Sequence, residues 1–443
     1  MSCATSREND RETGNPAAAP VSNTGDEAPE LTETQRREAE EFLRSPDLFD
    51  RIAKDIEEIG VVGEQELSLT VYLVFTSRVL PKPLKAVVQG PTSAGKTFVV
   101  EKVAELFPEE ALFQATSLSD QAWFYLPEGA VQHKAVVLGE REQNNSPERI
   151  DTRRAWRELM VSGKASRAVT VKNPATGEFT VEMKTVRGPC AFIETTTSEA
   201  VMEEDASRML PLRACESRQQ TLRIIERVAL DAAGQSAGPE EIKAIVARHH
   251  AAQRLLAEYE GEPMDIPYAR LIEVPVDQVI ARRVYAYVLG VVRSVARLRT
   301  LQKPPELRNQ ADLADYEIAY PLIRPFVARQ LSVVTDIDRE TVERLKESGL
   351  RVFTAPQVAV LLRVSDRHAR RRLAMLFSSD MIEDTDGTRK NRREYRLTGR
   401  ALSGAEQCLT TPEALREAIE EPEAIQAENE HSDALAEVMS DGM

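Results

Sequence analysis

The sequence Gly-Pro-Thr-Ser-Ala-Gly-Lys-Thr at residues 90–97 constrains the fold of this 443-residue chain more than any other segment. It fills every fixed position of the pattern G-x-x-x-x-G-K-[ST], a loop whose backbone N–H groups surround a phosphate chain. The apolar run at 85–89 precedes it, and residues 97–106 follow with apolar side chains at helical spacing. The order predicts a buried strand, a glycine-rich turn and a helix, which is the usual setting of a phosphate-binding loop.

The loop itself supplies the candidate ligands of a nucleotide. Glycine at both ends allows the backbone to turn around the phosphates. The ammonium group of Lys96 is suited to the β- and γ-phosphates, and the hydroxyl of Thr97 is suited to Mg²⁺. The candidate contacts are Gly90, Pro91, Thr92, Ser93, Ala94, Gly95, Lys96 and Thr97.

Apolar runs alternate with helical patterns after the loop, which is typical of an α/β fold with a parallel sheet. Candidate strands lie at 111–116, 134–140, 190–197 and 209–214. Residues 166–186 alternate with a period of two around an Asn-Pro-Ala-Thr-Gly turn and predict a β-hairpin.

Composition and pattern divide the chain into segments with different expected structure. Residues 1–40 carry 9 acidic and 4 basic side chains, residues 401–443 carry 11 and 1, and the net charge of −15 therefore comes entirely from the two ends. The expected segments are an acidic disordered tail (1–31), a helical N-terminal layer (32–82), the α/β core (83–218), a helical lid and connector (219–345), a winged helix (346–400) and an acidic flexible tail (401–443).

The bulk composition excludes several classes of protein. Four cysteines show no metal-ligand spacing and no disulfide framework. No apolar run reaches the length of a membrane span, and the polar N-terminus is unlike a signal peptide. We therefore expect a cytoplasmic protein without a membrane partner.

Hydrolysis of a nucleotide on such a loop needs a carboxylate, a polar contact to the γ-phosphate and usually an arginine. Glu140 ends one apolar strand, and it is the candidate general base and, with Thr97, a candidate Mg²⁺ ligand. Thr195, Thr196 and Thr197 end the strand that follows the hairpin, with Thr196 and Thr197 as the favoured contacts to the γ-phosphate or the water, and Arg208 lies eleven residues beyond Thr197. Each has a simpler explanation as well: a strand end in solvent, a polar loop, and a surface ion pair with the acidic residues just before the arginine.

This order of motifs resembles the AAA+ ATPases. The hairpin directly before the polar strand end resembles the pre-sensor-1 hairpin group, which includes minichromosome-maintenance and superfamily-3-like helicases. More narrowly, residues 45–400 resemble the ATPase part of primase-associated proteins from bacterial mobile elements. The resemblance implies ATP and Mg²⁺ as cofactors and a homo-oligomeric ring such as a hexamer, with Arg208 acting on a neighbouring subunit and Arg282 or Arg283 as a second sensor.

Two departures from the family pattern qualify these expectations. The pair that usually reads Asp-Glu at the acidic strand end is Gly139–Glu140 here. Either Glu142 or Thr97 alone compensates for the missing Mg²⁺ partner, or hydrolysis is slow, so the prediction of nucleotide binding is firmer than that of rapid turnover. No Cys/His cluster of the primase type exists, so primase activity is not expected.

The segment 346–400 predicts contact with DNA. Its second helix and its wing concentrate basic residues, and residues 365–400 hold 10 basic and 6 acidic side chains. A recognition helix in a groove and a basic wing on phosphate form a common arrangement. The candidate contacts are Arg367, Arg370, Arg371, Arg389, Lys390 and Arg392. A winged helix that contacts protein instead is the alternative.

Two functions fit these observations. The first is a DNA-dependent, helicase-like or DNA-remodelling ATPase in mobile-element replication. The second is an ATP-gated DNA-binding regulator or helicase loader with slow or no hydrolysis. A small-molecule kinase fits less well, because it would not need a winged helix. The acidic tails are candidate sites for a protein partner.

Overall fold

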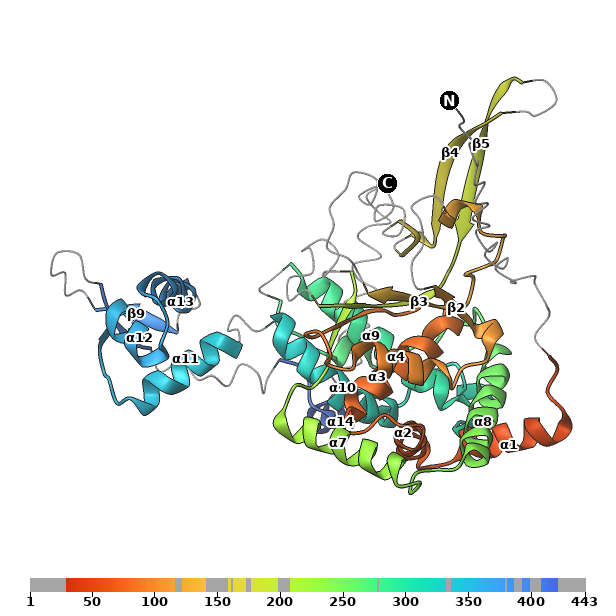
Figure 1. The fold of residues 1–443 in the computed structure, drawn as a ribbon, viewed down its shortest axis with the longest axis horizontal. Coiled ribbons are helices and arrows are strands. Elements are labelled where there is room, and N and C mark those ends of the chain that lie inside the picture. The colour runs from red at the N-terminus through yellow and green to blue at the C-terminus, as the bar shows by residue number, and fades with distance from the viewer. Residues whose placement is uncertain are drawn as a thin grey trace, which may run out of the picture.

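The computed structural model describes residues 29–115, 122–140, 158–160, 162–172, 177–197, 208–276, 279–331, 336–378, 381–385, 393–398 and 408–420. Its centre is a five-stranded parallel sheet flanked by helices, which confirms the predicted α/β class (Figure 1). The strand order is β2-β3-β6-β1-β7. The strands are β1 (Lys85–Gln89), β2 (Leu112–Ala115), β3 (Ala135–Glu140), β6 (Ala191–Thr196) and β7 (Leu210–Arg213).

Both faces of the sheet are covered, which explains why its strands are nearly continuous apolar runs. On one face, Ala86, Val88 and Ile193 join a large hydrophobic core with the flanking helices. On the other face, Val87 and Phe192 pack in a smaller core that includes the base of the hairpin. The alternation of side chains along each strand therefore sends neighbouring residues to different cores.

The N-terminal helices and the helices after the sheet form one packed layer. Helix α1 (Glu33–Arg44) begins with a capping box between Thr32 and Gln35, as expected for a Thr-x-x-Gln start. In α3 (Gln65–Thr76), every residue from Leu67 onward is buried. The other helices of the main body are α2 (Leu48–Glu58), α4 (Lys96–Ala104), α7 (Arg218–Ala232), α8 (Pro239–Ala257), α9 (Ala281–Leu298) and α10 (Leu313–Leu331).

Short 3₁₀ turns connect several of these elements. They are η1 (Ser77–Val79), η2 (Glu109–Ala111), η3 (Ala122–Tyr125), η4 (Ala269–Leu271), η5 (Thr300–Gln302) and η6 (Pro305–Leu307). Side chains from α1, α3, α8, α9 and α10 belong to a single hydrophobic core. The expected N-terminal layer and lid are thus not separate bodies in this structure. None of the described helices combines the length and apolar character that a membrane span requires.

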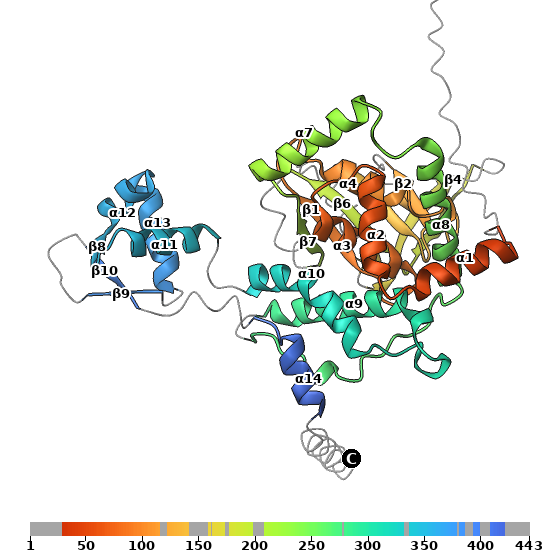
Figure 2. The same cartoon turned by 90° about the horizontal axis from the view of Figure 1, so that it is seen from below.

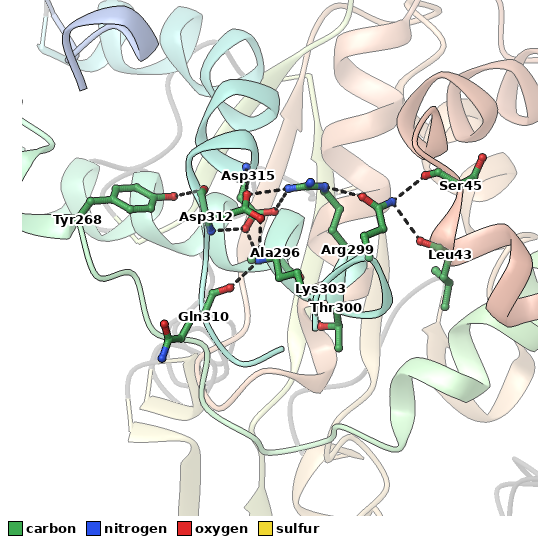
Figure 3. A network of polar contacts seen from close by, with 11 residues as sticks. Leu43, Ser45, Tyr268, Ala296, Arg299, Thr300, Lys303, Gln310, Asp312 and Asp315 are labelled. Atoms are coloured by element: carbon green, nitrogen blue, oxygen red, sulfur yellow. Dashed lines mark hydrogen bonds and ion pairs between the residues drawn. The ribbon is translucent and has the colours of Figure 1, made fainter. Parts of the chain in front are cut away.

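A buried ionic network fixes the turn between α9 and α10 (Figure 3). The Asp315 carboxylate is fully buried and accepts hydrogen bonds from Arg299 Nη1 at 2.5 Å and from Lys303 Nζ. Arg299 Nε donates to the side chain of Gln302, whose Nε2 donates to the carbonyls of Leu43 and Ser45 at the end of α1. The network therefore joins residues about 260 positions apart in the sequence.

A second buried network joins α2, α3 and α8. His249 is fully buried; its Nε2 lies 2.9 Å from Asp55 Oδ2 and its Nδ1 lies 2.9 Å from the hydroxyl of Tyr72. Burial lowers the pKa of His249 despite the hydrogen bond to Asp55. A neutral ring that donates from Nε2 and accepts at Nδ1 satisfies both contacts. Arg248 Nη2 also donates to both oxygens of Asp55 at 2.8 Å, which keeps that carboxylate paired.

The predicted hairpin is confirmed. Strands β4 (Lys164–Lys172) and β5 (Phe179–Arg187) pair antiparallel without a register break. They stand out from the sheet in Figure 1. The expected tip falls at 173–177, and residues 173–176 lie outside the described residues.

The C-terminal unit has its own hydrophobic core. It contains α11 (Asp336–Glu347), α12 (Ala355–Leu362) and α13 (Asp366–Ser378), with β8 (Phe353–Thr354), β9 (Ile382–Asp384) and β10 (Glu394–Leu397) in an antiparallel sheet of order β8-β10-β9. Val342 and Leu345 of α11 belong to this core. The unit therefore begins about ten residues before the boundary expected at 346.

The expectation of a flexible tail from 401 onward is wrong for residues 408–420. Helix α14 (Pro412–Glu420) packs on the main body, and its Leu415 is fully buried in the large core. The Tyr316 hydroxyl donates to the carbonyl of Thr410 at 2.5 Å, and the Thr410 hydroxyl accepts from the backbone N–H of Glu273 at 2.7 Å. A few apolar residues anchor this acidic segment to the main body. The average composition of residues 401–443 does not reveal this, because it is dominated by the acidic side chains.

Candidate functional site

The predicted phosphate loop lies at the carboxyl end of β1, between the strand and α4. The chain leaves β1 toward β2 at one edge of the sheet and leaves β6 toward β7 at the other edge. β1 and β6 are neighbours, and each connection passes the other strand on its way to the opposite edge of the sheet. Open α/β sheets bind ligands outside the carboxyl ends of their strands, which is where the loop lies.

The loop has the backbone that a phosphate cradle requires. Gly95 has φ +78° and directly precedes α4, whose first backbone bond runs from Val99 N–H to the Gly95 carbonyl at 2.9 Å. Ser93 also has a positive φ of 70°. A Cβ on Gly90 would lie 3.4 Å from Ala94 Cβ and 3.5 Å from Lys96 Cδ, so it would enter the hollow of the loop. The first N–H groups of a helix have no acceptor within the helix, so the start of α4 is suited to an anion.

Lys96 is positioned by the loop itself. Only 5% of the residue is exposed, and its Nζ donates to the carbonyl of Pro91 at 2.7 Å. A carbonyl satisfies one of the three N–H donors of an ammonium group. The other two N–H donors of the Lys96 ammonium group can bind phosphate oxygens, so the residues present fit a nucleoside triphosphate.

The structure brings Thr97 together with Thr195 at the end of β6. Their hydroxyl oxygens lie 3.5 Å apart, and Thr195 is 2% exposed. Thr195 is also the register partner of Glu140 at the end of β3. The backbone of Glu140 is therefore one strand away from β6 and two strands away from β1, while its side chain, like Glu142, lies outside what the structure describes.

Of the three threonines predicted from sequence, Thr195 is the one whose hydroxyl lies beside Thr97. Thr196 is buried and belongs to the opposite face of β6, because consecutive side chains of a strand alternate. Thr197 is half-buried and follows the strand. The sequence prediction named all three threonines and favoured Thr196 and Thr197, whereas the register of β6 against β1, with Val88 opposite Thr195, distinguishes Thr195.

Arg208 is half-buried and lies just before the amino end of β7. Since β1 and β7 are parallel, Arg208 lies at the amino ends of the strands, whereas the phosphate loop of the same chain lies at their carboxyl ends. Both Arg208 and Arg283 lie close enough to Tyr287 of α9 to oppose the rise in its pKa that burial causes. The two predicted arginines therefore approach the same tyrosine. Arg282 is exposed in the first turn of α9.

A cleft of about 740 Å³ lies at the carboxyl end of β7, and its lining includes none of residues 90–97. Ala214, which follows β7, donates its N–H to the Gln89 carbonyl at 3.1 Å. Glu64 in the cleft accepts from the Cys215 N–H at 2.8 Å, and burial raises the pKa of this carboxyl. Arg213 and Arg223 also line the cleft. No sequence pattern singled out these residues, because the strand end, α2 and α7 meet only in the fold.

The hairpin carries basic residues near its base and an apolar stripe. Lys164 and Arg187 are exposed register partners at its base, and the Arg167 guanidinium lies over Phe124 at 5.9 Å. Phe179, Val181 and Met183 form the exposed stripe on β5. The charge of Lys184 is paired with Glu182 at 2.8 Å. The side chain of Lys172 lies outside the described set.

The C-terminal unit presents its predicted arginines on α13. Arg367, Arg370 and Arg371 are exposed, whereas Ala369 and Leu373 on the same helix are buried in the unit's core. The Nε of Arg370 donates to Asp366 at 2.8 Å, so part of its charge is compensated. Arg389, Lys390 and Arg392 lie outside the described residues.

No protein-family model matches this sequence, and no curated protein matches it. Within the described ranges, no group of three or more His, Cys, Asp or Glu side chains could hold a metal ion.

Proposed function

We propose that this chain is an ATP-binding, DNA-dependent ATPase of the AAA+ type, helicase-like or DNA-remodelling, that serves replication of a mobile element. The observation that carries the proposal is the loop at residues 90–97, with Lys96 buried and Thr97 facing Thr195 at the carboxyl ends of β1 and β6. ATP supplies the phosphoanhydride bond whose hydrolysis drives a change of conformation.

Each residue has a role that follows from its chemistry. Lys96 and the N–H groups of the loop bind and neutralise the phosphate oxygens. Thr97 and Glu140 would hold Mg²⁺, which would neutralise charge on the phosphate oxygens, and the Glu140 carboxylate would accept a proton from the attacking water. The Thr195 hydroxyl orients that water or the γ-phosphate.

Arg208 acts on the nucleotide of a neighbouring subunit in a ring. The position of Arg208 at the amino ends of the strands supports this role, because the phosphate loop of its own chain lies at the opposite, carboxyl ends. Arginine supplied in trans stabilises the charge that develops during phosphoryl transfer.

The DNA-binding part of the proposal rests on the C-terminal unit. Its three helices and its antiparallel sheet support a winged helix, with Arg367 and Arg371 outward on the second helix of the pair α12–α13. Such a helix enters a groove while the wing lies on the phosphate backbone.

DNA-stimulated ATP hydrolysis tests this function. We expect phosphate release to rise when DNA is added and to disappear in Lys96→Ala. Hydrolysis that persists in the Lys96→Ala protein would refute the assignment of the site.

Gly139 favours a second candidate, an ATP-gated DNA-binding regulator or helicase loader. It removes the carboxylate that usually assists Mg²⁺, so turnover would be slow. A strand-displacement assay separates the two functions: unwinding supports the helicase, and ATP-dependent DNA binding without unwinding supports the regulator.

A further inference from the structure

Helix α7 contacts the rest of the protein through polar side chains, and its apolar side chains face solvent. Gln220 Nε2 donates to the carbonyl of Val62 at 2.7 Å, and the Arg227 guanidinium donates to the carbonyls of Glu57 and Glu58 at 2.8 and 2.9 Å. These bonds cap the end of α2 and hold α7 in one orientation. Figures 1 and 2 show the helix along the outer edge of the main body.

The outward side of α7 is an apolar stripe. Leu222, Ile225 and Val228 are 56%, 59% and 60% exposed, and Ala229 and Ala232 are exposed as well. Ile224 and Leu230, which flank the stripe on either side of the helix, are 43% and 39% exposed. Monomeric proteins rarely leave large apolar side chains together on one element. No other described residue covers this stripe.

The spacing of the stripe fits a helix partner. Leu222, Ile225, Ala229 and Ala232 follow one another at intervals of three, four and three, which is the a/d spacing of a two-helix seam. The two large residues lie in the first half and the two alanines in the second half. An antiparallel pair therefore sets large side chains against small ones, Leu222 against the partner's Ala232 and Ile225 against the partner's Ala229.

Charge favours the same orientation. Arg218 begins α7, and in an antiparallel pair it lies at the C-terminal end of the other helix, where the backbone carbonyls are negative. A parallel pair would set Arg218 against its own copy.

We propose that the outward face of α7 binds the α7 of a second copy of this chain in an antiparallel pair. The helix has 15 residues, about 22 Å of length, so the contact buries less than the roughly 800 Å² per partner of a standard interface. The pair is therefore weak and depends on protein concentration. It does not depend on the nucleotide, so Lys96→Ala pairs as well as the unaltered protein, and failure of the nucleotide site would leave this inference standing.

Disulfide trapping in the full chain tests the orientation. In a background with Cys3 and Cys215 changed to Ser, Ile225→Cys and Ala229→Cys are made separately, each with a different tag, and oxidised alone and mixed. We expect several-fold more cross-linked dimer in the mixture than in either protein alone. Cross-linking of Ile225→Cys chiefly with itself, or no cross-link above that of the cysteine-reduced background, would overturn the proposal.

Sedimentation at increasing protein concentration gives an independent readout. Ile225→Glu should remain monomeric at concentrations where the unaltered protein dimerises. The matched control is Val276→Glu, since Val276 is 83% exposed and lies outside α7. Equal dimerisation of Ile225→Glu and the control, or a monomer at every concentration for the unaltered protein, would contradict the pairing of α7.

Discussion

Replacing Lys96 by Met should weaken the binding of Mg·ATP without unfolding the protein. The lysine stem is buried, and Met fills nearly the same volume, so the cavity that an alanine would leave is avoided. The change removes the hydrogen bond from Nζ to the Pro91 carbonyl, which contributes about 1 kcal/mol to folding. It also removes a charge-assisted bond to phosphate, worth about 1.5–3 kcal/mol. The dissociation constant should therefore rise by about 10- to 150-fold.

Calorimetric titration of Mg·ATP at fixed salt measures this effect. Lys102→Met is the matched control, because Lys102 is on the same helix but its ammonium group is paired with Glu105 at 2.9 Å. The control should bind as the unaltered protein does. Equal affinity in Lys96→Met and Lys102→Met, with both proteins folded, would show that residues 90–97 do not hold phosphate.

Four further predictions follow from the site and the two buried networks. Thr195→Val, which keeps the shape of the side chain, should lower the rate of ATP hydrolysis about 10- to 100-fold, and an unchanged rate would remove Thr195 from the site. Asp315→Asn removes the buried carboxylate that Arg299 and Lys303 share, leaves them only the exposed carboxylate of Asp312, and should cost about 1–3 kcal/mol in urea unfolding. Burial lowers the pKa of His249, so its contribution to stability is complete above the unfolded value of about 6.5 and is lost as the pH falls below it; His249→Gln should flatten this pH dependence. Replacing Arg367 and Arg371 by Ala should weaken DNA binding on all sequences and reduce its salt dependence by about two ion contacts.

Local patterns predicted the elements that depend on neighbouring residues. The octet at 90–97 marked the turn between β1 and α4, and the apolar runs marked β2, β3, β6 and β7 close to their bounds. The period-two alternation marked the hairpin. These predictions succeed because strands buried on both faces and glycine-rich turns leave a direct trace in the sequence.

Features that depend on long-range packing left no such trace. Thr195 rather than its neighbours faces Thr97, which is decided by the register of β6 against β1. Helix α14 returns to the main body through Leu415 although its segment is acidic. The apolar pattern of α7 predicts a buried face, yet that face is outward, because Arg227 and Gln220 bind the helix by its polar side. Periodicity identifies an amphipathic helix but does not identify the surface that covers it.

The rate of ATP hydrolysis with and without DNA tests the central claim most directly. Phosphate release should increase severalfold on addition of DNA, and this increase should be absent in Lys96→Met and reduced when Arg367 and Arg371 are replaced by Ala. Hydrolysis that is unaffected by DNA, or that is the same in Lys96→Met as in the unaltered protein, would contradict the account of a DNA-dependent ATPase.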